Sequence, residues 1–100
     1  MANEHDLIRD ASKGVRSRQL LEDELLVDAF RTLENAYTLA WRRTYIDDTA
    51  AREKLFLAIN VVGLVRDHLA AAVTNGKFAE AELKTIEHMR QRKKHWHEVR

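Results

Sequence analysis

The side chains in this sequence with the most evident potential for chemistry are basic and aromatic, and they gather near its C-terminus. From Arg90 onward five basic residues accompany one acid, Glu98. Guanidinium and ammonium groups contact phosphates and an indole ring stacks on bases, so this mixture is typical of nucleic-acid contact. The alternative interpretation is a solvated helix end whose cations complement the helix dipole. The candidate DNA-binding residues are Arg90, Arg92, Lys93, Lys94, Trp96 and Arg100.

Metal and catalytic chemistry have weaker support. His95 and His97 are two positions apart, which on a helix points them to different sides, so they do not share a metal ion easily. The sequence has no cysteine, no nucleophile elbow and no phosphate loop. Among the arginines, only Arg66 approaches the apolar surface expected of the helices, so no set of cations converges on a substrate. We therefore expect no catalytic residue, metal, cofactor or small-molecule substrate.

The composition predicts an all-α protein that forms a single helical domain over residues 1–100. There is no proline, only three glycines are present, and the strong helix formers dominate. The first ten residues are acidic and polar, unlike a signal peptide, and the longest apolar stretch is too short to cross a bilayer. These features predict a cytoplasmic protein that does not associate with a membrane.

Periodicity and breakers predict where the helices lie. A short N-terminal helix would end near Gly14. Ser17 would then cap an unbroken helix over residues 18–45, and the polar break at 46–49 would lead into a helix over 50–74. Helices joined so tightly fold back on each other, which gives a long antiparallel hairpin. Asn75-Gly76 would end the second helix, and a third from Phe78 to the C-terminus would complete an arrangement like a three-helix bundle.

The helix expected over residues 50–74 is apolar around most of its circumference. Only one heptad position is consistently polar, with Glu53, Asn60, Asp67 and Thr74 spaced seven apart. A helix that packs against one neighbour needs an apolar stripe only somewhat over 100° wide, so this one has to be covered from two directions. The second cover is either the C-terminal helix or another subunit, and both remain open. The predicted protein-interface residues are Leu57, Val61, Leu64 and Ala71.

Four motifs carry a resemblance to known proteins. They are the aromatic-rich segment Tyr37 to Trp41, Ala-Arg-Glu-Lys at 51–54, Val-Arg-Asp-His-Leu at 65–69 and Asn-Gly at 75–76. Residues 18–83 resemble a group of short all-α proteins of unassigned role that are encoded in phage and prophage regions of proteobacteria. The resemblance implies a shared helical fold and a genetic setting, and it supplies no site residues. The basic end after Arg90 lies outside it.

These patterns lead to two functional hypotheses of different kinds. The first is a non-enzymatic phage or prophage protein that acts in virion assembly or DNA packaging. Its partners would be its own copies, as a homo-oligomer, or other phage proteins, in the host cytoplasm or within a virion. The alternative is a nucleic-acid-binding protein, similar to a terminase small subunit, that holds DNA with its basic C-terminal helix.

Overall fold

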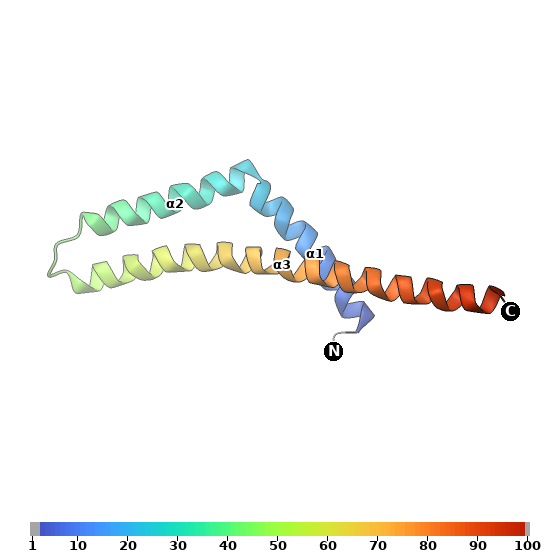
Figure 1. Cartoon of the computed structure of the whole chain (residues 1–100). Helices are drawn as coiled ribbons and strands as arrows, with labels where there is room; N and C mark the ends of the chain where they lie inside the picture. The colour runs from blue at the N-terminus through green and yellow to red at the C-terminus, as the bar shows by residue number, and fades with distance from the viewer. Residues whose placement is uncertain (1–2, 100) are drawn as a thin grey trace.

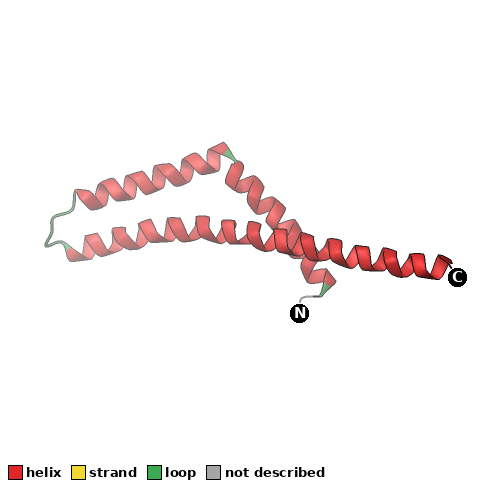
Figure 2. Ribbon diagram, in the orientation of Figure 1, coloured by secondary structure: helices red, strands yellow, loops and turns green. Residues whose placement is uncertain are grey.

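The chain folds into three α-helices. A computed structural model describes the backbone of residues 3–99 and the side chains of residues 3–94. The helices are α1 (Glu4–Glu22), α2 (Glu24–Arg42) and α3 (Thr49–Val99), and no strand occurs within residues 3–99 (Figures 1 and 2). The all-α class expected from the composition is confirmed.

The molecule is long and thin. Figure 1 shows α2 and α3 as an antiparallel hairpin, with α1 crossing α3 near the middle and the C-terminal end of α3 running on beyond the crossing. The Cα atoms span 81 × 28 × 14 Å, and their radius of gyration is 22.0 Å. A compact domain of 100 residues has a radius of gyration of about 13 Å. The helices therefore enclose little volume for the length of chain they contain.

A single residue, Asp23, separates α1 from α2. Its backbone is extended, at φ −71° and ψ 117°, and its side chain accepts a hydrogen bond from the Leu26 backbone N–H at 3.1 Å. Asp23 therefore ends one helix and caps the next. The unbroken helix predicted over residues 18–45 is wrong in this respect. Ser17 does not act as its cap either, because it is buried in the middle of α1.

The predicted polar break between the hairpin helices is confirmed. α2 ends at Arg42 and α3 begins at Thr49, and the Asp48 carboxylate accepts a hydrogen bond from the Ala51 backbone N–H at 3.3 Å. A carboxylate at this position pairs with an N–H that has no partner inside the helix. The residues between the two helices form the exposed tip of the hairpin.

The predicted helix end at Asn75-Gly76 is wrong, and α3 continues through it to Val99 as one helix of 51 residues. The helix end expected near Gly14 is wrong as well, because α1 continues to Glu22. Gly14 and Gly76 face each other where α1 crosses α3. A Cβ atom built on either glycine would lie 2.7 Å from the Cα atom of the other. The two glycines allow the helix backbones to touch, and neither has a positive φ.

Very little of the chain is buried. Only six described residues fall in the buried class, and none of the large side chains is fully enclosed. The solvent-accessible surface is 8473 Å². A compact monomer of 11.7 kDa is expected to expose about 5,900 Å². The solvent-accessible surface of the chain is thus roughly 2,600 Å² larger than that of a compact monomer of the same mass. The buried residues are Leu7, Gly14, Ser17, Val62, Gly76 and Ala79.

Candidate protein-interaction surface

The contact between α2 and α3 has one polar edge. There the Arg66 guanidinium donates to the Glu34 carboxylate at 2.7 Å and lies over the Phe30 ring, 5.4 Å from its centroid. Both partners of the ion pair remain partly exposed, so we expect it to contribute at most about 1 kcal/mol to folding. The pair fixes how the two helices are rotated relative to each other. It identifies Arg66, the arginine nearest the apolar surface, as a structural residue.

The opposite edge of the same contact is apolar. Leu33 and Val65 each precede a member of the ion pair by one position, which is a rotation of about 100° around its helix. In an antiparallel pair of helices, equal rotations carry both residues to the same side. Leu33 is 42% exposed and Val65 46% exposed, so neither is covered by the other helix.

A surface of exposed apolar residues continues from this side along both helices, and on α3 it runs round to the face turned away from Arg66. We call it the apolar edge. Its members from α2 are Leu25, Ala29, Leu33, Ala36 and Ala40, and those from α3 are Leu57, Val61, Leu64 and Val65. All nine residues belong to the exposed class. The interface predicted from the sequence includes Leu57, Val61 and Leu64 but neither Val65 nor any residue of α2.

The predicted interface residues on α3 form a regular row. Leu57, Val61 and Leu64 are each more than half exposed, at 56%, 55% and 63%, and Ala71 is also exposed. Together with His68 they are spaced four, three, four and three, which is the spacing of one face of a coiled-coil helix. We call these five residues the α3 stripe. The interface predicted from the sequence does not include His68.

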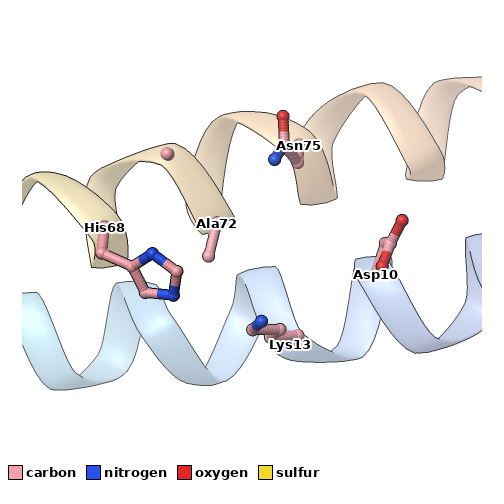
Figure 3. A pocket seen from close by; sticks show the side chains of 6 residues that line it. Asp10, Lys13, His68, Ala72 and Asn75 are labelled. Carbon is pink, nitrogen blue, oxygen red and sulfur yellow. The ribbon is translucent and has the colours of Figure 1, made fainter.

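The C-terminal end of the α3 stripe runs into a shallow groove between α1 and α3. Figure 3 shows His68, Ala72 and Asn75 on α3 opposite Lys13 and Asp10 on α1. The groove has a volume of about 210 Å³ and is open to solvent. One positive and one negative side chain of α1 therefore stand beside the end of the row, and Ala71 also lines the groove.

Aromatic residues hold the hairpin closed near its tip. The Arg52 guanidinium lies 4.6 Å from the Trp41 ring centroid and donates to the Thr44 hydroxyl at 2.8 Å. Trp41 therefore packs within the chain. The tip itself is bare, with Tyr45 80% and Ile46 88% exposed, and Phe78 on α3 is 72% exposed.

The basic end divides into two parts. Arg90 donates to the Glu4 carboxylate at the start of α1, so it ties α1 to α3. This hydrogen bond holds the pKa of Glu4 below its ordinary value of 4.5. Arg92, Lys93 and Lys94 are exposed on the part of α3 beyond that pair. The side chain of Trp96 and the whole of Arg100 lie outside the described residues.

α3 is also long and apolar enough to cross a membrane, by length and composition alone. Within Thr49–Lys94 the mean hydropathy of one 18-residue window reaches 1.5, and only 6% of that window is buried. The uncharged run from Leu55 to Val65 is roughly half of the 20 residues that a span needs, and Arg66 and Asp67 follow it directly. Each charge at a bilayer centre costs about 3 kcal/mol.

Within the described part of the chain, no three His, Asp or Glu side chains are grouped closely enough to hold a metal ion. Comparisons with protein-family models, curated proteins and solved structures give no match.

Proposed function

We propose that this chain is a non-enzymatic assembly protein that acts by packing its apolar edge against protein, its own copies included. The observation that carries the proposal is the imbalance between core and surface. Six of the residues whose side chains are described are buried, whereas the chain exposes roughly 2,600 Å² more than a compact monomer of its mass. Specific protein interfaces bury about 800 Å² on each partner, and obligate ones more. The surplus is large enough for such an interface.

Folding energetics support the same proposal. Burial of a large aliphatic side chain contributes about 1.5–3 kcal/mol, and a small domain is stable by only about 5–15 kcal/mol. Because Leu57, Val61 and Leu64 are each more than half exposed, the isolated chain lacks more than half of that contribution at each of them. A partner that covers them would supply several kcal/mol. Association and stable folding would then be the same event.

The biological setting that we propose is phage virion assembly or DNA packaging, in the host cytoplasm or in the particle. It rests on the resemblance of residues 18–83 to phage and prophage proteins. An extended helical shape with one uncovered apolar side suits a subunit whose apolar side is covered by neighbouring subunits in an assembly.

A matched pair of substitutions tests the contact surface. Val61→Asp places a carboxylate on the apolar edge, and Asn60→Asp makes the same charge change one position away, on the polar heptad position of α3. In an assembly, Val61→Asp buries a charge at a cost of several kcal/mol, whereas in an isolated chain the half-exposed site tolerates it. We expect Val61→Asp to lose association, by size-exclusion chromatography with light scattering, and Asn60→Asp to keep it. The proposal fails if both variants associate and unfold like the unmodified chain.

A second candidate function, nucleic-acid binding, is favoured by the exposure of Arg92, Lys93 and Lys94 on the projecting end of α3. Replacing these three residues with glutamine would remove three phosphate contacts. The slope of log affinity against log salt for duplex DNA should then become shallower by about 2.7. Fluorescence anisotropy over a range of salt concentrations measures it. No binding at low salt, or an unchanged slope, would reject this function.

A further inference from the structure

Resting on the proposed function, we infer that the protein covering the apolar edge is a second copy of this chain, packed antiparallel against the first about a twofold axis near residues 62 and 63 of α3. The α3 stripes of the two copies would lie against each other. The two α3 helices would then form the centre of the pair, with each α2 on the outside.

The spacing of the α3 stripe sets the register. In antiparallel coiled coils, residues at the two apolar heptad positions alternate and face each other across the contact. With the axis near residues 62 and 63, Val61 faces Leu64 of the second copy and Leu57 faces its His68. The two central layers are then made wholly of large aliphatic side chains. A shift by one heptad toward the C-terminus would instead place Leu57 opposite Asn75, an amide.

The same register brings complementary charges together. Glu53 and Lys54 of one copy would reach the groove of the other, which Ala71 and Ala72 line together with Asp10 and Lys13 of α1. Each copy thus offers one acid and one base to the opposite pair. These contacts lie at the rim of the interface, where charges determine register and orientation.

The bare hairpin tip is also accounted for. Phe78 of one copy would stand at the level of the start of α3 in the other, next to the tip residues Tyr45 and Ile46. Tyr45, Ile46 and Phe78 are 72–88% exposed in the single chain, although they are large and apolar. An antiparallel second copy would bring these three into contact.

The basic C-terminal ends of α3 favour antiparallel over parallel packing of the two copies. In a parallel pair, Arg92, Lys93 and Lys94 of both copies would lie side by side, closer than the Debye length of about 8 Å at physiological salt. In the antiparallel pair each basic end lies roughly 50 Å from the axis, on opposite sides. Like charges are thereby kept apart, and both ends remain free for another partner.

Disulfide trapping tests the pairing, because the chain has no cysteine of its own. Leu57→Cys and His68→Cys are prepared separately, one with a mass tag, refolded together from denaturant and oxidised. We expect the mixed disulfide between the two variants, at twice the 11.7 kDa of one chain, and little product from either variant alone. In the antiparallel pair the two copies of residue 57 lie about 16 Å apart along the axis, beyond the 7 Å reach of a disulfide. Asn35→Cys, on the exposed polar side of α2, is the background control.

Two results would overturn the inference. A Leu57→Cys disulfide with itself would mean parallel packing, and cross-linking no greater than the Asn35→Cys background would mean that the α3 stripes do not meet. Neither result would reject the proposed function, which the Val61→Asp comparison tests separately. That comparison reports whether the apolar edge is needed for association with any geometry, whereas the cross-links report the partner and its direction.

A charge exchange checks the register independently. Lys54→Asp should weaken self-association by about three- to tenfold, because two symmetric rim contacts become repulsive. Adding Asp10→Lys to the same chain should restore it, since each pair again carries opposite charges. If the double variant associates no better than Lys54→Asp alone, Lys54 does not face Asp10 and the register is wrong.

Discussion

Replacement of Gly76 by alanine tests how closely α1 and α3 approach. The added Cβ would lie 2.7 Å from the Gly14 Cα atom and 3.1 Å from the Asp10 carbonyl oxygen. Both are backbone atoms, so no side chain can rotate away. Carbon atoms in contact are normally about 3.5–4.0 Å apart. The helices therefore have to separate by about 1 Å at the crossing.

The expected change in stability is the balance of two effects. Overpacking of this kind costs about 1–3 kcal/mol, whereas alanine in place of glycine inside a helix gains about 1 kcal/mol. We expect Gly76→Ala to be destabilised by up to about 2 kcal/mol and its Tm to fall by up to roughly 10 °C. Thermal unfolding followed by helical circular dichroism at one fixed protein concentration measures it.

Gly63→Ala is the matched control, because it is the same substitution in the same helix. An added Cβ at Gly63 meets nothing within 4 Å in the chain. Gly63 precedes Arg66 by three positions, so it lies on the same side of α3 as Arg66. Only the gain in helix propensity remains, so this variant should be stabilised by up to about 1 kcal/mol. If Gly76→Ala were stabilised as much as Gly63→Ala, α1 would not cross α3 at Gly14, and the packing described above would be wrong.

Three further substitutions probe the contacts that shape the chain. Asp23→Ala removes the cap of α2 and should cost about 1 kcal/mol in thermal unfolding, whereas Asp23→Asn keeps the acceptor and should cost much less. A double-mutant cycle on Glu34 and Arg66 should give a coupling of at most about 1 kcal/mol, and a much larger value would mean that the pair is more deeply buried than described. Because Arg90 lowers the pKa of Glu4 in the folded chain, the stabilisation from Glu4 is present above pH 4.5 and is lost as the pH falls through the lowered pKa. Glu4→Gln should therefore show a smaller fall in Tm between pH 7 and pH 3 than the unmodified chain does.

The helical class and the hairpin could be predicted from the sequence because they depend on local signals. The absence of proline and the apolar periodicity indicate helix throughout. The acids at 47 and 48 mark a polar break between long helices, and Asp48 does cap α3. The uncovered residues on α3 were also recognisable, because a helix that is apolar almost all round needs two covers.

The glycines show where local signals fail. Gly14 and Asn75-Gly76 were interpreted as helix ends, since glycine commonly provides a left-handed cap. Both glycines instead lie inside helices, where each leaves room for the other. That pairing joins residues 62 positions apart, and only the three-dimensional arrangement shows it. The bend at Asp23 was missed for a related reason, because one aspartate within a helical pattern is a weak break until tertiary contacts favour it.

The concentration dependence of thermal unfolding tests most directly whether a second copy completes the fold. For a dimer, a hundredfold increase in chain concentration adds about 2.8 kcal/mol per dimer. We expect Tm to rise by several degrees over that range, and light scattering to give about twice the 11.7 kDa of one chain. A mass of 11.7 kDa together with the same Tm at both concentrations would contradict the pairing.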